Sequence, residues 1–322
     1  MPDNVVTWGV LGSARINQSV LPAIDASSRC RLLALASRDA GRAVAESTRW
    51  GMARAYGSYE ALLADPEIDA VYISLPNSLH VRWTLAAIRA GKHVLCEKPL
   101  ALTAGDVQEI AAAAQTAGVA VAEAVMYRYH PQTIQVNDLL KAGAIGRVRL
   151  VSSWFTVQVQ DERESRMRPE LGGGSLWDLG VYPISYIRLV TGTEPGELAG
   201  MGKRGHTGVD EEFLGQMRFD GDIYGQFHVS FRMPRRMGLE IVGSDGVLTV
   251  PQPFKPGRGE QILLRRGTEV QTITVEGNDL YRPEIENFVD AVLLGHTSCV
   301  SLADTAGTIA VIARLLDEYR PA

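Results

Sequence analysis

The chain has 322 residues, of which 46% are hydrophobic and 21% charged, a balance typical of a globular protein long enough for two domains. A net charge of -5 without a concentrated stripe of Lys and Arg argues against nucleic acid as a partner. No apolar stretch approaches the roughly 20 residues of a membrane span and the amino terminus does not resemble a signal peptide, so we expect a cytoplasmic protein without membrane contact.

Residues 1–125 alternate between apolar runs and stretches with helical spacing. This alternation is typical of βαβ units, in which parallel strands form a sheet that helices cover on both faces. We therefore predict an α/β fold whose first domain, 1–125, is a doubly wound Rossmann sheet. The predicted strands are 5–11, 31–39, 70–77, 93–101 and 119–125, and the predicted helices are 17–27, 40–51, 59–69, 81–92 and 104–118.

The second predicted domain, 126–322, is dominated by alternation of apolar and polar residues. Asp-Gly and Arg-Gly pairs ending at Gly221, Gly246 and Gly267 separate the alternating runs, as glycines with positive φ do in tight hairpin turns. We predict an α+β domain with a large, mainly antiparallel sheet that has one open face, through which a homodimer or homotetramer is expected to form. The predicted strands lie in 147–160, 197–205, 211–233, 238–252 and 260–275, and the predicted helices in 133–143, 175–192, 283–295 and 303–320.

The sequence GVLGSARIN, residues 9–17, follows the first strand, where dinucleotide-binding proteins carry G-x-G-x-x-G. The three positions hold Gly12, Ala14 and Asn17. Ala14 is small enough for backbone to approach a pyrophosphate, whereas Asn17 is expected to keep the helix slightly farther from the strand. Backbone N–H groups that open a helix bind anions. The expected cofactor contacts in this loop are Gly12, Ser13, Ala14, Arg15 and Ile16.

The second strand ends in Ser37, Arg38 and Asp39, where Rossmann enzymes distinguish NAD from NADP. A small hydroxyl and a guanidinium suit the 2′-phosphate of NADP, so NADP is favoured over NAD and both residues are predicted to bind it. Arg38 could equally be a solvated surface residue. Asp39 could repel the phosphate or cap the next helix, and we prefer the second interpretation.

Two later strands end in unusual sequences. LPNSLH, 75–80, is either an ordinary strand-to-helix loop or a backbone along the ribose of the nicotinamide half, with Asn77 able to cap the next helix. If the loop lies along the ribose, the residues expected to bind the cofactor are Leu75, Pro76, Asn77 and His80. In CEKPLA, 96–101, charged groups at the mouth of a sheet need partners, and the proline imposes an extended or cis peptide that can aim Lys98 into the cleft. Glu97 is expected to form hydrogen bonds near the cofactor.

Three motifs, EKPLA (97–101), MYRYHPQ (126–132) and GGGSLWDLGVYPI (172–184), resemble the Gfo/Idh/MocA oxidoreductases over nearly the whole chain. The resemblance points to the branch with dimeric dihydrodiol dehydrogenase, NADP-dependent D-xylose dehydrogenase and bacterial sugar 3-ketoreductases. It implies a Rossmann domain followed by a domain with a large open sheet, and it places Lys98 beside the nicotinamide and the reacting oxygen. It also implies that Tyr182 stands where the inositol dehydrogenase branch has a histidine.

The third motif supplies the second catalytic group. Ser175 can cap a helix on which Asp178 and Tyr182 share one face, and Pro183 is expected to kink or restart that helix. A tyrosine that exchanges protons near neutral pH needs a nearby cation, and Lys98 can be that cation. We predict that Tyr182 transfers the proton, Lys98 lowers the pKa of Tyr182 and polarises the oxygen, and Asp178 positions a neighbouring hydroxyl. The alternative is that Tyr182 is a core aromatic.

Further residues are expected at the cleft. Arg128 is expected to contact the cofactor, and Tyr127 and His130 to border the cleft, Tyr127 on the substrate side. The remaining candidates on the substrate side are Trp154, Phe155, Arg163, Arg166 and Tyr281, although a solvated loop accounts for the two arginines equally well.

The predicted reaction is reversible hydride transfer between NADP and a hydroxyl or carbonyl carbon of a sugar, polyol or dihydrodiol. Two alternatives stay open: a reductase of the 3-keto group of a nucleotide-linked sugar, and a non-catalytic NADP-sensing regulatory protein of the same fold. The joint presence of Lys98, Asp178 and Tyr182 favours an enzyme. The histidines and the three separated cysteines show no ligand spacing, so neither a metal site nor a disulfide framework is expected.

Overall fold

The computed structural model describes residues 5–277, 279–296 and 298–319. These residues form two compact units. The first unit extends to Tyr129 and includes the later segment Tyr281–Ala306. The second unit contains His130–Leu280 and the chain from Gly307 onward.

The segment Tyr281–Ala306 belongs to the first unit because of its apolar side. Its helix α8 (Arg282–Leu294) buries Ile285, Phe288 and Val289 in the core of that unit, where the Phe288 ring lies 5.2 Å from the ring of Trp8. The spacing of apolar residues predicts the helix but not the sheet against which it packs. The domain limits 1–125 and 126–322 stay predictions.

A six-stranded parallel sheet forms the core of the first unit, in the order β3-β2-β1-β4-β5-β6. The strand order reverses between β1 and β4, and doubly wound sheets bind ligands at the carboxyl ends of the strands near such a point. The predicted Rossmann sheet is confirmed. The strands are β1 (Val6–Leu11), β2 (Cys30–Ala36), β3 (Arg54–Tyr56), β4 (Ala70–Ile73), β5 (His93–Glu97) and β6 (Val121–Ala124).

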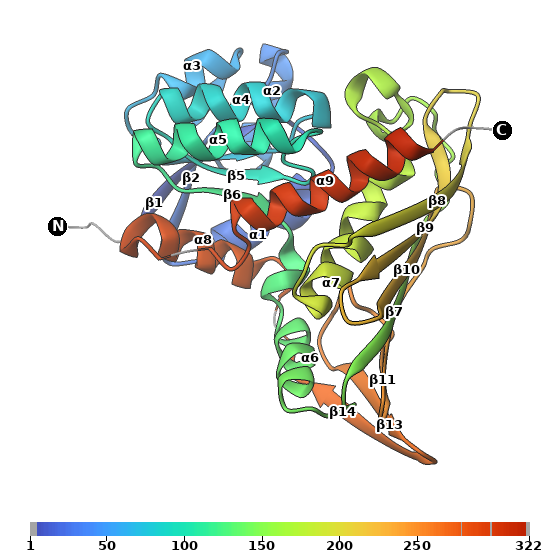
Figure 1. Cartoon of the computed structure of the whole chain (residues 1–322). Coiled ribbons are helices and arrows are strands. Elements are labelled where there is room, and N and C mark those ends of the chain that lie inside the picture. The colour runs from blue at the N-terminus through green and yellow to red at the C-terminus, as the bar shows by residue number, and fades with distance from the viewer. Residues whose placement is uncertain (1–4, 278, 297, 320–322) are drawn as a thin grey trace. The chain divides into compact units, whose positions relative to one another are not determined.

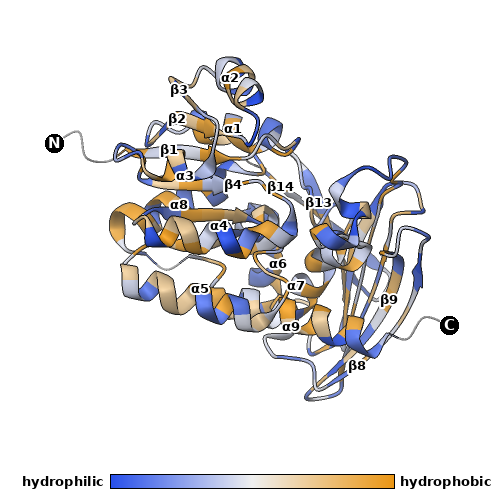
Figure 2. Ribbon diagram, turned by 90° about the horizontal axis from the view of Figure 1, so that it is seen from above, coloured by the Kyte–Doolittle hydropathy of each residue, from blue (hydrophilic) through white to orange (hydrophobic). Residues whose placement is uncertain are grey.

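Helices cover both faces of this sheet. Residues of α1, α2 and α8 share one buried core, and Figure 1 shows α4 and α5 on the face opposite α8. Figure 2 shows hydrophobic and hydrophilic residues together on α4 and α5, as expected for helices with one buried side. The helices are α1 (Asn17–Asp25), α2 (Ala40–Arg49), α3 (Tyr59–Leu63), α4 (Asn77–Arg89), α5 (Ala104–Ala117) and the 3₁₀ turn η1 (Met126–Tyr129).

Several details of the first unit differ from the prediction: for example, the strand expected over 70–77 ends at Ile73, and the helix expected over 81–92 is α4, Asn77–Arg89. The short strand β3 was not predicted, because its three residues are only partly buried or exposed and form no apolar run. The helix expected over 59–69 ends at Leu63. Asp65 precedes Pro66, and the proline ring disfavours helical backbone at the residue before it.

An eight-stranded sheet dominates the second unit, in the order β14-β13-β12-β11-β7-β10-β9-β8. Only β7 and β10 pair in parallel, so the prediction of a large, mainly antiparallel sheet is confirmed. The strands are β7 (Val148–Thr156), β8 (Glu197–Arg204), β9 (Asp210–Phe219), β10 (Ile223–Ser230), β11 (Arg236–Gly243), β12 (Val247–Val250), β13 (Glu260–Arg266) and β14 (Glu269–Val275).

Helices pack on one face of this second sheet (Figure 1). Helix α7 (Val181–Thr191) packs on β7 and β10, and α9 (Leu302–Glu318) brings Leu315 against β8. Helix α6 (Pro131–Lys141) packs on β13 and β14. The opposite face carries exposed apolar side chains: Met201 is 71% exposed, Tyr224 48% and Leu214 44%.

The hairpin glycines follow the prediction at two of three turns. Gly221 and Gly267 have φ angles of 76° and 57°, in the left-handed region. Gly246 does not belong to the glycines with positive φ, so that prediction is wrong. A Cβ on Gly246 would lie 2.6 Å from the carbonyl oxygen of Arg265, so this glycine permits close strand approach instead.

Candidate active site

The loop after β1 is closed by Gly12 and Asn17. Gly12 has a φ of 110°, and a Cβ on it would lie 2.8 Å from the carbonyl oxygen of Ser74 after β4. The buried Asn17 amide donates a 3.0 Å hydrogen bond to the Gly12 carbonyl, so a side chain braces the turn where a glycine was expected. Among the next residues, Arg15 is exposed and Ser13, Ala14 and Ile16 are partly exposed.

The end of β2 carries an exposed arginine and a helix cap. The Asp39 carboxylate accepts a 2.9 Å hydrogen bond from the Arg42 N–H, so the cap prediction is confirmed. The Asp39 N–H donates to the hydroxyl of the buried Ser37. Arg38 is exposed and lies near Tyr59, whose pKa is raised by burial and lowered to a lesser extent by this arginine.

The loop after β4 differs in two ways from the prediction. Helix α4 begins at Asn77, with Pro76 at the preceding position, so Asn77 is not the cap. His80 is completely buried, and its ring nitrogens lie 2.7 Å from the carbonyl oxygens of Leu75 and Pro99. Burial lowers the pKa of His80. A side chain without exposed surface does not touch a dinucleotide in this conformation.

The loop after β5 holds Glu97 and Lys98, both partly exposed. The Tyr72 hydroxyl donates a 2.6 Å hydrogen bond to the Glu97 carboxylate. The Lys98-Pro99 peptide is cis, one of the two forms expected. The Leu100 N–H donates a 2.9 Å hydrogen bond to Glu123 of β6, a buried carboxylate missed by sequence reasoning.

Glu123 also accepts a 3.0 Å hydrogen bond from the Thr305 hydroxyl. Burial raises the pKa of Glu123, and the two hydrogen bonds oppose that rise. A glutamate inside an apolar strand was the available signal, because a buried charge needs partners.

The motif MYRYHPQ is held in place by buried side chains and their hydrogen bonds. Tyr127 is completely buried, and Arg128, 7% exposed, donates a 2.8 Å hydrogen bond to Asp304. His130 is buried in the second unit and accepts a hydrogen bond from the Gln132 N–H at the start of α6. The side chains of Tyr127 and His130 are therefore both fully buried, and their place beside the cleft stays a prediction.

In the second unit, the motif GGGSLWDLGVYPI forms an irregular helix. A π-helical turn, η4 (Leu176–Gly180), runs directly into α7, so the irregularity expected at Pro183 lies just before this proline. Ser175 is not the cap, because its backbone is helical and its hydroxyl donates to Asp210. The Asp210 carboxylate caps the helix itself, accepting a 2.7 Å hydrogen bond from the Leu176 N–H.

Asp178 lies within the π-helical turn and Tyr182 lies in the first turn of α7. The Asp178 carboxylate accepts a 2.9 Å hydrogen bond from Arg166, which also pairs with Glu164. Arg166 thus lies beside the candidate catalytic helix.

Tyr182 sits in an aromatic cluster and is 4% exposed. Its ring centroid lies 5.3 Å from that of Phe155 and 5.5 Å from that of Phe254. The Lys255 ammonium lies 5.8 Å from the centroid of the Tyr182 ring. No local pattern in the sequence indicated Lys255, because its place depends on Phe254, its buried neighbour.

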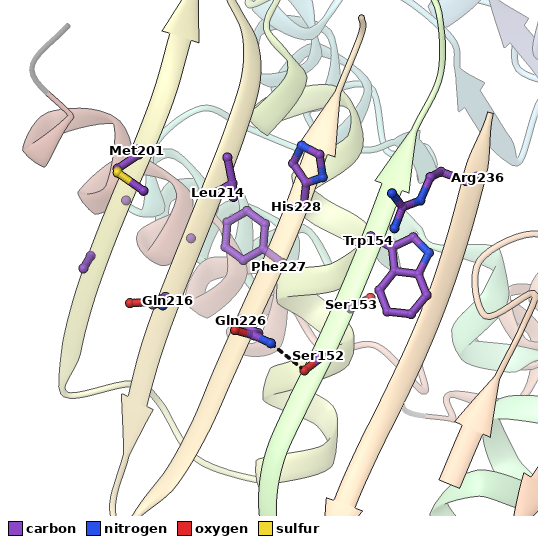
Figure 3. Close-up of a pocket in the computed structure, with 13 residues that line it drawn as sticks. Ser152, Ser153, Trp154, Met201, Leu214, Gln216, Gln226, Phe227, His228 and Arg236 are labelled. Carbon is purple, nitrogen blue, oxygen red and sulfur yellow. Dashed lines mark hydrogen bonds between the residues drawn. The ribbon is translucent and has the colours of Figure 1, made fainter. Parts of the chain in front are cut away.

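The other substrate-side candidates are scattered. Trp154 points to the face of β7 opposite Phe155 and lines a hollow of about 510 Å³ on the open face, with Arg236 over its ring (Figure 3). Arg163 is exposed and pairs with Asp161. Tyr281 lies in the first unit, packed against its core.

Among residues 5–277, 279–296 and 298–319, no three His, Cys, Asp or Glu side chains converge in a way that could hold a metal ion. In the same ranges, no helix has both the length and the apolar character needed to cross a membrane.

Two family matches and several relatives cover the chain. Residues 6–125 match the Gfo/Idh/MocA "Oxidoreductase family, NAD-binding Rossmann fold", and residues 133–249 match the "GFO/IDH/MocA C-terminal domain". D-xylose 1-dehydrogenase (NADP(+)) 2 from Haloferax volcanii is 38% identical, over 95% of this chain and 94% of that protein. A trans-1,2-dihydrobenzene-1,2-diol dehydrogenase from Danio rerio is 32% identical, over 97% of this chain and 95% of its own.

A crystal structure of a 3-ketoreductase from Actinomadura kijaniata in complex with NADP and TDP-benzene has the same fold. The TM-score is 0.93 at 30% identity, with 98% of both chains covered. Structures of its variants change one lysine and one tyrosine, at positions as far apart in sequence as Lys98 and Tyr182. Similarity over nearly the whole chain shows that this protein belongs to the Gfo/Idh/MocA family and is an oxidoreductase with an NAD(P)-binding Rossmann fold.

Proposed function

We propose that this protein is an NADP-dependent dehydrogenase or reductase that acts on a CH–OH or carbonyl carbon of a sugar, polyol or dihydrodiol. The observation that carries the proposal is the pair Lys98 and Tyr182, which matches in residue type and separation the two positions varied in the Actinomadura kijaniata 3-ketoreductase. Relatives named as D-xylose and dihydrodiol dehydrogenases support the substrate class.

The residues after β1 and β2 fit a dinucleotide with a 2′-phosphate. At Gly12 there is no room for a Cβ, as expected where backbone turns tightly around a pyrophosphate. Arg38 is exposed at the end of β2, and the neighbouring Asp39 carboxylate is engaged in capping α2. The cofactor would be held by Ser37, Arg38 and the backbone of residues 12–16. The names of the NADP-linked relatives support NADP over NAD.

The bound nicotinamide supplies the hydride acceptor or donor, and the chain supplies the proton chemistry. Tyr182 takes the hydroxyl proton during oxidation and returns it during reduction. Lys98 polarises the same oxygen and favours the phenolate of Tyr182 by its positive charge. Asp178, fixed by Arg166, accepts a hydrogen bond from a neighbouring substrate hydroxyl.

A second candidate is a reductase of the 3-keto group of a nucleotide-linked sugar. The TM-score of 0.93 with a 3-ketoreductase bound to TDP-benzene favours it. A dinucleotide sensor without catalysis is disfavoured, because the family match and the relatives are oxidoreductases and a sensor has no need of Lys98 with Tyr182.

The test is NADP reduction or NADPH oxidation with D-xylose and other aldoses, inositols, trans-dihydrodiols and TDP-linked 3-keto sugars. We expect Tyr182→Phe and Lys98→Ala to lower kcat about 10²–10⁴-fold on the best substrate. Tyr186→Phe is the matched control, because it removes the same hydroxyl one turn along α7 and should keep kcat. Full activity in Tyr182→Phe, or tighter binding of NAD than NADP, contradicts the proposal.

We also propose a homodimer or homotetramer that forms through the open face of the second sheet, defined by Met201, Leu214, Tyr224 and the hollow around Trp154. Exposed apolar residues around a hollow are typical of interaction surfaces. The cytoplasm stays the expected location.

A further inference from the structure

The segment Lys98–Leu100, here the lysine segment, is held from two sides by buried polar side chains. A ring nitrogen of His80 lies 2.7 Å from the Pro99 carbonyl oxygen, and the Glu123 carboxylate accepts the Leu100 N–H at 2.9 Å. Both contacts are to backbone directly after Lys98. The two contacts therefore constrain the position of the Lys98 Cα, from which the side chain extends.

Each of the two holding residues is itself fixed to a third segment. The other His80 nitrogen lies 2.7 Å from the carbonyl oxygen of Leu75, in the loop after β4. A neutral imidazole donates to one of these two carbonyl oxygens, and the protonated ring donates to both. The second Glu123 oxygen accepts from Thr305 at the start of α9. The lysine segment is thus linked to two other parts of the first unit.

Stability alone does not explain these polar residues. His80 is completely buried and Glu123 is 3% exposed, and burying such groups costs free energy that hydrogen bonds recover only in part. Apolar residues of similar size often stabilise a core as well or better. What an apolar residue cannot do is fix the carbonyl and N–H of a particular loop.

We propose that His80 and Glu123 are positioning residues for Lys98, holding the lysine segment so that the ammonium meets the reacting oxygen, and that His80 couples this segment to the loop after β4. The inference rests on the proposed function, because that function gives Lys98 its role. Neither residue touches substrate or cofactor; both act through the backbone.

The test compares apolar and conservative variants by two measurements. We expect His80→Leu and Glu123→Leu to lower kcat roughly 100-fold with a smaller change in KM, since misplacing a reacting group by about 1 Å costs that much. Glu123→Gln keeps an oxygen for the Leu100 N–H and should retain kcat within about threefold. Hydrogen–deuterium exchange of the lysine segment should rise in both leucine variants and stay unchanged in Glu123→Gln.

Lys92→Met is the matched control. The Lys92 ammonium donates two 2.8 Å hydrogen bonds to the carbonyl oxygens of Asp65 and Ile68, just before the amino end of β5, whereas Lys98 follows its carboxyl end. This variant removes two buried hydrogen bonds to backbone, so it should lower the unfolding temperature but preserve kcat and the exchange of the lysine segment.

The outcomes separate this inference from the proposed function. If Lys98→Ala keeps full kcat, the proposed function fails. If Lys98→Ala loses activity while both leucine variants keep kcat and show no faster exchange, the positioning role is wrong. Equal losses of kcat in Glu123→Gln and Glu123→Leu would also overturn it, because then the charge and not the hydrogen bond matters.

Discussion

Gly12 and Asn17 act on the same backbone group in the loop after β1. The Gly12 carbonyl accepts the Asn17 amide hydrogen bond, while the φ of 110° at Gly12 and the nearby Ser74 carbonyl leave no room for a Cβ. One glycine and one amide thus fix a turn that other dinucleotide-binding proteins form with three glycines.

Gly12→Ala should destabilise this turn and weaken cofactor binding. We expect the free energy of unfolding to fall by about 1–3 kcal/mol and the affinity for NADP to fall at least about tenfold, because the new Cβ meets the Ser74 carbonyl in a strained backbone conformation. Urea unfolding and calorimetric titration with NADP measure the two effects.

The control for that prediction is Gly51→Ala. Gly51 also has a positive φ, 65°, but no atom of the residues that the structure describes lies within 4 Å of the position that a Cβ would take there. A substitution at Gly51 therefore introduces backbone strain without a clash among those residues. It should cost about 1–2 kcal/mol of stability and leave NADP binding unchanged. Unaltered NADP binding by Gly12→Ala would contradict our account of the loop.

At the scale of elements, the helix that carries Asp178 and Tyr182 depends on a strand for its amino-terminal cap. Asp210, the first residue of β9, accepts hydrogen bonds from the Ser175 hydroxyl and the Leu176 N–H. Burial raises the pKa of Asp210 to about 6, because desolvation outweighs the hydrogen bonds and the charge of Arg204, which lower it. The stability of the helix that carries Asp178 and Tyr182 is therefore expected to depend on pH through this cap.

The pKa of Asp210 predicts how stability changes with pH. The Asp210 carboxyl has a pKa of about 6 in the folded chain and an ordinary pKa of 3.8 in the unfolded chain, so it binds its proton more tightly when the chain is folded. Its contribution to the free energy of unfolding therefore falls as pH rises from about 4 to about 6. The loss is roughly 3 kcal/mol. Asp210→Asn should lack this loss, and urea unfolding between pH 4 and 7 measures the difference. A free energy of unfolding that changes with pH in the same way in the wild type and in Asp210→Asn would refute this prediction.

At the scale of the whole molecule, the second sheet has two different faces. Helices α7 and α9 cover one face, while Met201, Leu214 and Tyr224 are exposed on the other, where Figure 3 shows Trp154 and His228 beside the hollow. Large apolar side chains exposed on one surface are typical of interaction surfaces, and the proposed assembly uses this face.

Charges placed on the open face should disrupt the proposed assembly. We expect Met201→Asp combined with Leu214→Asp to convert the oligomer to monomers in sedimentation velocity, because association would bury two unpaired carboxylates. Val44→Asp is the control: Val44 is 57% exposed on α2 of the first unit and should leave the oligomer intact. A double variant that sediments like the wild type would exclude the open face as the interface.

The sequence by itself determined the two sheets and supplied the candidate residues for the proposed chemistry. Parallel strands that are buried on both faces are apolar along their whole length, whereas antiparallel strands that are buried on one face alternate between apolar and polar residues. The pattern of apolar residues therefore distinguishes the two kinds of sheet. Short motifs at strand ends were enough to single out Gly12, Arg38 and Lys98 as candidates, since the fold brings the carboxyl ends of parallel strands to one edge. Tyr182 was singled out by a motif that lies on a helix of the second unit.

Only the tertiary structure decided what holds those residues in place. Asp210 and Glu123 meet the N–H groups of Leu176 and Leu100, far away in sequence, and His80 joins two loops. Local sequence shows neither such partners nor the complete burial of the Tyr127 and His80 side chains. Burial and pairing are properties of the packed chain, because each depends on which distant segments exclude water from a side chain.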